Sequence, residues 1–400
     1  MTHRWVLLAL FALLSTGPAL RAAAAPLTPL TPEEASVKRE LTRLVRQEDK
    51  AILAGDERRL RAVFLPGGRA GQALQEAKER QRFLRAWSQA RGLRLLSVRV
   101  SLRTPQIAFP TRDSVRVFAV VSEAYTYHYL PEGQEGRFGL GIRHDYLLAR
   151  QKGRLRIRAD YFTDPLDQDT RIPAPAQPES GRELPAAIFP QAHAPLEQPA
   201  AAYADRFCGA APGCGNHGLY NERYANYNGE GGDCTNFVSQ SLEAGGFREG
   251  GDWSYDRQAG EGSRAWSNAA GLRDYLEGSD RARIFARGTY AGLTRPSGAF
   301  PHGAAYALRI GDLISYIERG RVVHTAIVTA FDQRGVPLVD THTSDRYHVP
   351  WDLGWDRATR YLLWRVRYPA PHARRTAPGG GRAQERLRAG TLSRPRPPAG

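Results

Sequence analysis

The chain contains 400 residues, of which 42% are hydrophobic and 24% are charged, and its formal net charge is +15. One domain of this length would be unusually large, so the sequence predicts two globular domains that each bury a core. The basic excess favours contact with anionic cell-envelope polymers or phospholipid surfaces, and no recognition motif for specific nucleic acid accompanies it.

The first 25 residues have the pattern of a secretory signal peptide. Thr2 to Arg4 form a positive start, the run from Trp5 to Leu14 is nearly all apolar, and an alanine-rich stretch ends near Ala25. The apolar run is short for a membrane span, which favours cleavage over the alternative of a retained N-terminal anchor. The sequence therefore predicts a secreted or extracytoplasmic protein of the bacterial cell envelope, with no transmembrane segment in the mature chain.

Residues 26–163 are predicted to form an α+β domain. Helical patterns run from Pro32 to about Leu53 and from Gly71 to Gly92. From Leu93 onward apolar and polar residues alternate in four stretches, which end near Tyr161. This order predicts two helices followed by a small antiparallel sheet, and the sequence assigns no activity to this domain.

The rest of the chain divides into a linker, a second domain and a tail. Residues 164–200 are rich in Pro and Ala and lack periodicity, which is typical of a linker. The second domain spans residues 201–368. Residues 369–400 contain seven Arg and one Glu among Pro and Gly, a composition that predicts a disordered basic tail.

The three cysteines of the chain leave one thiol without an intramolecular partner. Cys208 and Cys214 are six positions apart in a loop-like run that is flexible enough to close a small disulfide. Cys234 is then the free thiol, which indicates a reactive role in an oxidising compartment. Cys208, Cys214 and His217 lack a fourth ligand at a suitable spacing for structural zinc, so we predict no metal and no cofactor.

Cys234 follows a Gly-Gly-Asp turn and begins a helical pattern that ends at Gly245. Asp233 is the predicted N-cap of this helix. Backbone N–H groups and the helix dipole at the first turn favour a thiolate, so we expect a lowered pKa for the Cys234 thiol. The same N–H groups can face the oxygen that becomes negative when an acyl carbon is attacked.

A predicted hairpin at residues 310–329 carries a candidate base. His324 lies near the beginning of its second strand, where the imidazole can meet the helix that carries Cys234. The next predicted strand, at residues 337–343, places Asp340 and His342 on one face because side chains alternate along a strand. Either of these residues can accept a hydrogen bond from His324 and hold its orientation.

The order of these motifs resembles that of the putative amidase domain family of bacterial exported proteins. More distantly, the segment is similar to the NlpC-type and CHAP cysteine amidases and endopeptidases, which cut peptidoglycan. The resemblance covers roughly residues 215–366 and implies a papain-like α+β domain with cysteine on a helix and histidine on an adjoining sheet. It is carried by GGDCTNFVSQ from Gly231, GDLISY from Gly311, HTAIV from His324 and HTSDR from His342.

The resemblance also implies roles for individual residues. Cys234 matches the nucleophile, His324 the general base, and His342 the polar residue that orients the base, with Asp340 as the alternative third residue. Four further residues are candidates for substrate binding: Tyr220, Asn221, Tyr224 and Asp233. Helix packing would equally explain the two tyrosines.

The implied activity is hydrolysis of an amide bond in a peptide or peptidoglycan-like substrate of the cell wall. Acyl transfer to an amine is an alternative, because the same Cys–His pair serves both reactions. A second alternative is a catalytically inactive module that binds the cell wall and keeps only the fold.

Overall fold

The structure is a computed structural model that describes residues 29–131, 133–162 and 198–369. The predicted signal peptide, the linker up to residue 197 and the basic tail beyond residue 369 lie outside the described residues. Within the described residues, no helix is long and apolar enough to cross a membrane.

Three helices precede the first strand. α1 (Pro32–Ala54) begins with a capping box, in which Thr31 and Glu34 satisfy each other's backbone N–H groups. It ends at Gly55, whose φ of 69° is left-handed and suits glycine. α2 (Glu57–Arg61) is a short helix that the sequence pattern did not predict, and α3 (Gly68–Ala90) corresponds to the second predicted helix.

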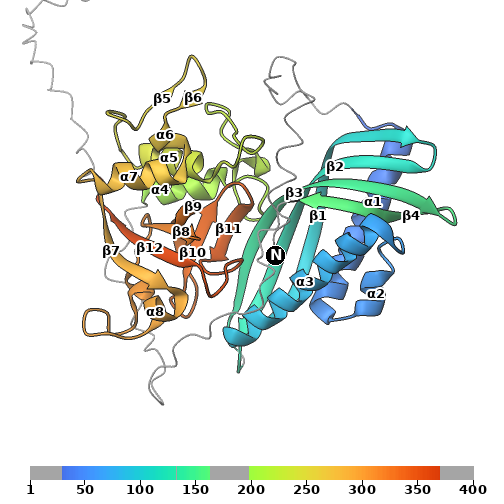
Figure 1. The fold of residues 1–400 in the computed structure, drawn as a ribbon, viewed down its shortest axis with the longest axis horizontal. Helices are drawn as coiled ribbons and strands as arrows, with labels where there is room; N and C mark the ends of the chain where they lie inside the picture. The colour runs from blue at the N-terminus through green and yellow to red at the C-terminus, as the bar shows by residue number, and fades with distance from the viewer. Residues whose placement is uncertain (1–28, 132, 163–197, 370–400) are drawn as a thin grey trace, which may run out of the picture. The chain divides into compact units, whose positions relative to one another are not determined.

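Four long antiparallel strands follow, as the alternation of apolar residues predicts. They are β1 (Leu93–Thr111), β2 (Ser114–Tyr129), β3 (Glu135–Gln151) and β4 (Arg154–Phe162). α1 and α3 pack against this sheet, and a core of buried aliphatic and aromatic side chains fills the space between them (Figure 1). The predicted α+β class with an antiparallel sheet is confirmed for this part of the chain.

The second part of the chain alternates short helices and strands. Its helices are α4 (Pro199–Phe207), α5 (Cys234–Ala244), α6 (Arg264–Ser267), α7 (Ala269–Glu277) and α8 (Tyr290–Thr294), with single 3-10 turns at Asn216–Gly218 and Ala304–Ala307. Its main strands are β7 (Ala282–Thr289), β8 (Leu313–Glu318), β9 (Arg321–Phe331), β10 (Pro337–Thr341), β11 (Asp345–Pro350) and β12 (Arg360–Val366). The two-residue strands β5 (Tyr255–Asp256) and β6 (Glu261–Gly262) form a separate small ribbon.

The two predicted domains share one sheet of ten strands, an arrangement that the sequence pattern did not predict. β3 pairs with β2 along its length, with β4 through its C-terminal half, and with β11 at residues 139–141. Gly139 and Gly141 allow the loop at residues 210–212 to approach, since a Cβ on either glycine would lie within 2.9 Å of that loop's backbone.

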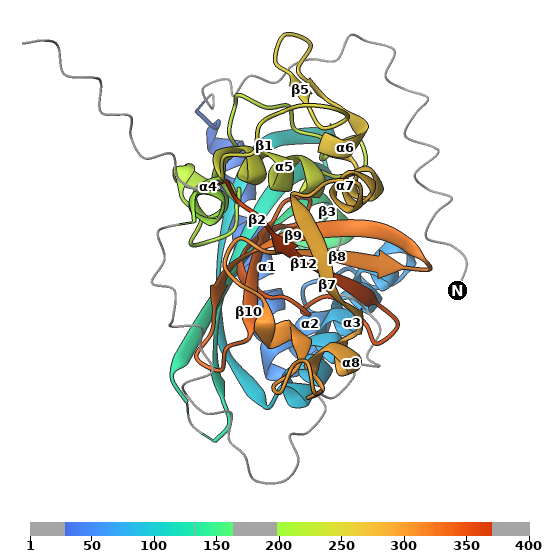
Figure 2. The same ribbon diagram turned by 90° about the vertical axis from the view of Figure 1, so that its left-hand side faces the viewer.

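The sheet of the second part has a different helix layer on each face. α4, α5 and α7 lie together on one side of β9, where Phe237 and Val238 of α5 pack with Leu313 and Ile327 (Figures 1 and 2). The opposite face holds a second core around Tyr316, Ala326 and residues of α8. Successive side chains of a strand point to opposite faces, so this division decides which strand residues can meet α5.

Candidate active site around Cys234

Cys234 is the first residue of α5 and is the free cysteine of the described chain. Gly231 and Gly232 precede it with φ values of 113° and 122°, and these left-handed conformations turn the chain sharply into the helix. The backbone N–H of Asp233 donates to Thr343 Oγ1 at 2.9 Å, which fixes this turn to the segment after β10. The predicted Gly-Gly-Asp turn and helix start are therefore present.

Cys234 is only 8% exposed, and its thiol reaches the backbone of Thr325 in β9. Its sulfur lies 3.7 Å from Thr235 Oγ1 and accepts a hydrogen bond from the backbone N–H of Thr325. Burial raises the pKa of the Cys234 thiol, and the negative charge of Asp233 adds to this effect, although the two threonines oppose it. The expected lowering of the pKa at the helix N-terminus is thus wrong for this conformation, because loss of hydration outweighs the local dipoles.

His324 lies on the face of β9 that points away from α5. It is the cross-strand partner of Tyr316, and its ring lies 5.4 Å from the Tyr316 ring and 5.6 Å from the Trp355 ring. Nε2 is 3.1 Å from Thr341 Oγ1. Burial, together with the positive charge of Arg346, lowers the pKa of His324 to about 3, so the imidazole is neutral at physiological pH.

The described conformation does not bring Cys234 and His324 into contact. Thr325 and Ile327 face α5, whereas His324 and Ala326 face the opposite core, as strand alternation requires. Among the described residues, the sulfur of Cys234 has no hydrogen bond to a histidine. What reaches the sulfur is the backbone of Thr325, the residue that follows His324.

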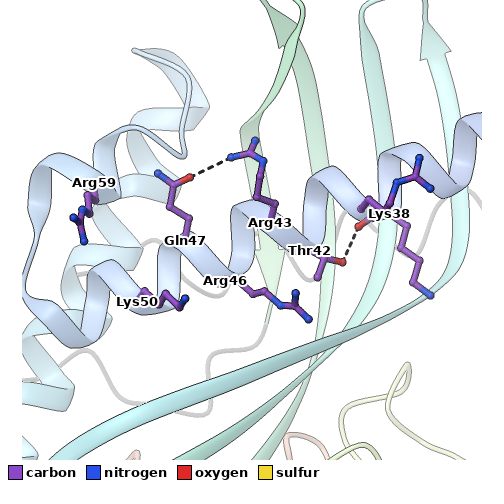
Figure 3. Close-up of a pocket in the computed structure, with 8 residues that line it drawn as sticks. Lys38, Thr42, Arg43, Arg46, Gln47, Lys50 and Arg59 are labelled. Carbon is purple, nitrogen blue, oxygen red and sulfur yellow. Dashed lines mark hydrogen bonds between the residues drawn. The ribbon is translucent and has the colours of Figure 1, made fainter.

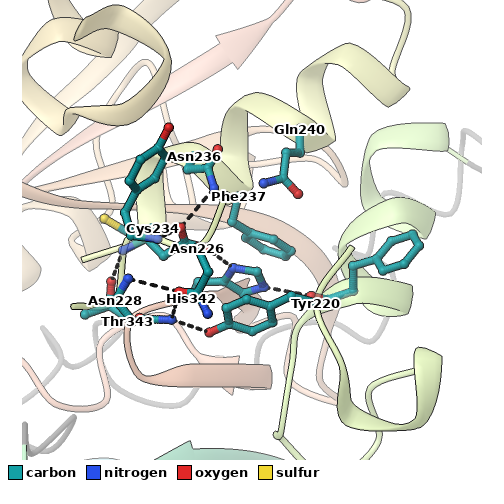
Figure 4. A network of polar contacts seen from close by, with 12 residues as sticks. Tyr220, Asn226, Asn228, Cys234, Asn236, Phe237, Gln240, His342 and Thr343 are labelled. Carbon is teal, nitrogen blue, oxygen red and sulfur yellow. Dashed lines mark hydrogen bonds and ion pairs between the residues drawn. The ribbon is translucent and has the colours of Figure 1, made fainter. Parts of the chain in front are cut away.

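His342 lies on the same side of the sheet as α5 and is 1% exposed. Its ring stacks between Tyr220, at 3.7 Å, and Phe237, at 4.0 Å, as Figure 4 shows. Nε2 donates to the carbonyl oxygen of Phe207 at 2.7 Å, and Nδ1 is 2.6 Å from Asp233 Oδ2. Because both ring nitrogens have partners already, His342 forms a buried bridge between α4 and the start of α5 rather than a contact with His324.

Asp233 occupies the N-cap position, yet its side chain does not cap the helix. Oδ1 accepts hydrogen bonds from the backbone N–H of Tyr227 and from Asn236 Nδ2, both at 2.9 Å. Oδ2 faces His342. The predicted capping hydrogen bond from the Asp233 side chain is therefore wrong. The carboxylate instead bonds to the buried imidazole of His342 and to the backbone N–H of Tyr227.

Asp340, the alternative third residue, also points toward the α4 side of the sheet. Oδ1 accepts from Thr329 Oγ1 at 2.9 Å and from the backbone N–H of His348 at 2.8 Å. Burial and the nearby charge of Asp205 raise the pKa of the Asp340 carboxyl well above its ordinary value. Asp340 and His342 share a face as predicted, but Thr341 between them is the residue that reaches His324.

The predicted substrate-binding residues other than Asp233 take part in internal contacts. The Tyr220 hydroxyl bonds to Asp345 and accepts from Arg143 Nη2 at 2.8 Å. Asn221 Nδ2 donates to the Tyr203 hydroxyl at 2.9 Å, while Tyr224 bonds to Glu243 and packs against Tyr255 and Trp266. These contacts agree with the alternative interpretation of Tyr220 and Tyr224, in which the two tyrosines pack inside the protein and do not bind substrate.

A disulfide joins Cys208 to Cys214, whose Cα atoms are 5.5 Å apart. The loop that it closes lies on β3, and Asp345 Oδ2 accepts from the backbone N–H of Ala210 at 2.8 Å. Arg143 of β3 approaches Asp345 to 3.4 Å from the other side. Sequence reasoning missed Arg143, Thr325 and Thr341, because their roles depend on pairing between strands that are far apart in the chain.

A basic groove lies on the exposed side of α1, remote from Cys234 in the sequence. It has a volume of about 630 Å³ and is shown in Figure 3. The lining residues are Lys38, Arg39, Thr42, Arg43, Arg46, Gln47, Lys50 and Arg59. Of the Lys and Arg side chains that line the groove, only Arg59 forms an ion pair within the described residues, and its partner is Asp56. Most of the positive charge of the groove is therefore not neutralised by the protein.

The site around Cys234 lies within a segment of the chain that matches a known protein family. Residues 196–364 match the family model described as "Putative amidase domain". Over 151 residues the chain is 31% identical to an uncharacterized protein of Bacillus subtilis, YhbB, an alignment that covers 36% of this chain and 43% of that protein. The chain thus spans less than half the length of this curated relative.

Two solved structures resemble part of the fold. One is the intermembrane space region of the chloroplast protein ARC6, with a TM-score of 0.21, 17% identity, and coverage of 31% of this chain and 95% of that chain. The other is an NTF-2-like protein of unknown function from Shewanella oneidensis, with a TM-score of 0.19, 13% identity, and coverage of 32% and 98%. TM-scores this low support no argument about function.

Proposed function

We propose that the protein is a secreted cysteine-dependent amidase that hydrolyses an amide bond in a cell-wall peptide, with Cys234 as the nucleophile. The observation that carries the proposal is a free thiol at the first residue of a helix, within a segment that matches the amidase domain model. The cell-wall substrate rests on the resemblance of the motifs and on the predicted export.

The proposed chemistry is that of a papain-like cysteine amidase. It is supported by a helix that begins with cysteine and packs on an antiparallel sheet that carries histidine. The sulfur attacks the carbonyl carbon, the amine leaves with a proton, and water then releases the acid from the acyl-enzyme. The backbone N–H groups at the start of α5 are free of intrahelical partners and are the candidate donors to the oxyanion.

His324 is the proposed base, and its neutral imidazole is in the protonation state that a base needs. To meet the sulfur, the ring must leave Tyr316 and turn toward the α5 face. The register of β9 against β8 shifts beside His324, between the pairs Tyr316–His324 and Ile317–Val322. Such a bulge is the place in a strand where a side chain can be re-aimed, so we propose that the described conformation is a resting state.

The test is hydrolysis of purified peptidoglycan by the full mature protein, with released amines and peptides measured by mass spectrometry. Cys234→Ser should abolish the reaction, and His324→Ala should slow it by about a hundredfold or more. His302→Ala is the matched control, because His302 lies in the loop before the 3-10 turn at Ala304 and has no role in this proposal. Unchanged hydrolysis by Cys234→Ser would contradict the proposal.

The two alternatives separate in the same assay. Acyl transfer predicts that an added amine, such as glycinamide, becomes joined to the acyl product at the expense of the free acid. An inactive wall-binding module predicts sedimentation of the protein with the peptidoglycan and no release of fragments by the wild type.

A binding role for the first part of the chain is favoured by the basic groove of α1. Arg39, Arg43, Arg46 and Lys50 recur at helical spacing along one stripe of the helix. An unneutralised row of cations attracts a chain of regularly spaced negative charges. We propose that the groove holds an anionic phosphate-bearing polymer of the envelope and so keeps the enzyme on the wall.

A further inference from the structure

Three side chains with metal-binding atoms meet between α4 and the sheet, beside the bridge made by His342. They are Asp205 of α4, Asp340 of β10 and His348 of β11. One ligand atom from each lies within 4.8 Å of the other two. His348 Nε2 and Asp205 Oδ1 are 3.0 Å apart. Residues that are up to 143 positions apart in the sequence therefore converge on one point.

Asp340 provides the second, independent observation. The residue is fully buried, with 0% exposure, and its Oδ1 is satisfied by Thr329 and by the backbone of His348. Its Oδ2 is buried and receives no N–H or O–H group of the described residues, and the carboxyl group of Asp205 lies close enough to share a proton with Asp340. A buried carboxylate oxygen without a donor costs free energy, so a native structure needs a reason to keep it.

The protein itself does not neutralise this pair of carboxyl groups. Within the described chain, no Lys or Arg forms an ion pair with Asp205 or Asp340, and His348 is the group that faces Asp205. Two ionised carboxylates at this spacing would repel each other in a site of low dielectric unless a proton or a cation lies between them. A bound cation would remove that repulsion and would supply the missing partner of Asp340 Oδ2.

We propose that Asp205, Asp340 and His348 bind one divalent cation of the zinc type. Imidazole nitrogen with two carboxylate oxygens suits zinc better than calcium or magnesium, which prefer oxygen ligands alone. Zinc binds such ligands at about 2.1 Å, so a tetrahedral ion would hold them about 3.4 Å apart. His348 Nε2 and Asp205 Oδ1 are already near this spacing. The other ligand atoms need to move by only about an ångström or two, and water would complete the coordination.

The site would act as a clamp beside the candidate active site. Asp205 and Phe207 both lie at the end of α4, while Asp340 lies at the end of β10 and His342 directly follows this strand. The ion would link Asp205 of α4 to Asp340 of β10, and the hydrogen bond from His342 to the carbonyl oxygen of Phe207 links the same two segments nearby. His342 also bonds to Asp233, the residue before α5. The ion would therefore make the contacts that position the start of α5 more rigid.

The experiment measures zinc on the full mature protein, purified without a histidine tag and stripped with a chelator. After dialysis against ZnCl₂, mass spectrometry of the metal should give one ion per chain, and the melting temperature should rise because the ion binds the folded state. Asp205→Asn and His348→Gln should each lower the affinity at least about tenfold and remove the thermal shift. Both side chains are partly exposed, so these variants are expected to fold.

Asp252→Asn and His217→Gln are the matched controls, because both residues are exposed and lie outside the cluster. They should bind zinc like the wild type. Replacement of zinc by cobalt(II) adds visible absorption bands whose intensity reports the coordination geometry of the bound ion. Wild-type protein that binds no zinc would overturn the proposal and would indicate a proton shared by the two aspartates. Zinc binding that survives both ligand variants unchanged would also overturn it, because the ion would then lie elsewhere.

Discussion

The thiol of Cys234 combines a helix N-terminus with nearly complete burial, and the two features act on its pKa in opposite directions. The helix end and the N–H of Thr325 favour the thiolate. Removal of water and the charge of Asp233 favour the thiol, and burial is the largest effect. The described conformation therefore favours a neutral thiol at Cys234 and, on the other face of β9, a neutral imidazole at His324.

Alkylation of the folded protein by iodoacetamide should report this raised pKa. The rate at Cys234 should have a midpoint above the ordinary thiol value of about 8.5, because only the thiolate reacts. Peptide mapping after a timed reaction at several pH values gives the midpoint. A urea-unfolded sample is the control and should titrate near the ordinary value. A midpoint below that of the unfolded sample would contradict the described burial.

The same pKa shift has a consequence for stability, and its sign can be stated. The folded state holds the thiol proton more tightly than the unfolded state, so the contribution to stability is complete below about pH 8.5 and is lost as the pH rises through the folded pKa. The free energy of unfolding of the wild type should therefore fall with rising pH relative to that of Cys234→Ser, measured by urea denaturation.

At the scale of elements, the start of α5 depends on a polar bridge from β10. Asp233 and His342 are each 1% exposed and lie 2.6 Å apart, so neither group has water as an alternative partner. The carboxylate also holds the Tyr227 loop, and the imidazole holds the end of α4. One pair of side chains thus connects two helices, a loop and a strand.

Asp233→Ala should destabilise the fold by about 3 kcal/mol or more, because it leaves a buried imidazole and a backbone N–H without their partner. Urea denaturation followed by fluorescence measures the change. Asp252→Ala, at an exposed aspartate, should change stability by less than about 0.5 kcal/mol. A loss as small as that of the control would mean that His342 finds another acceptor.

At the scale of the whole molecule, the groove of α1 and the thiol of α5 lie in different parts of one chain that share a sheet through β3 and β11. Arg143 of β3 also bonds to Tyr220 and Asp345 of the second part. Backbone hydrogen bonds between β3 and β11 therefore connect the part of the chain that carries the groove to the part that carries the thiol, in addition to the linker.

Triple charge reversal of Arg39, Arg43 and Arg46 to Glu should weaken binding to linear polyphosphate at least tenfold at low salt, because Coulomb attraction becomes repulsion. Fluorescence anisotropy with labelled polyphosphate measures the affinity. The matched control reverses the exposed Arg69, Arg82 and Arg85 of α3, which changes the net charge equally and keeps the basic tail. Equal losses in both variants would mean that net charge, and not the groove, drives binding.

Local patterns in the sequence were sufficient for the longest helices and strands and for the free thiol, although they missed short elements such as α2. Alternation from Leu93 onward predicted the long strands, the Gly-Gly-Asp turn predicted the start of α5, and the odd number of cysteines singled out Cys234. These features depend on residues that are neighbours in the chain, where backbone geometry links sequence directly to structure.

Tertiary structure alone decided which face each strand presents to α5. Alternation correctly placed Asp340 and His342 together, but it could not say that His324 and Thr341 belong to the opposite face. That assignment depends on which side of the sheet α5 packs, and on the register beside Tyr316. The pairing of β3 with β11 and the meeting of Asp205 with Asp340 likewise join distant positions, and contacts of that kind leave no periodic signal in a single sequence.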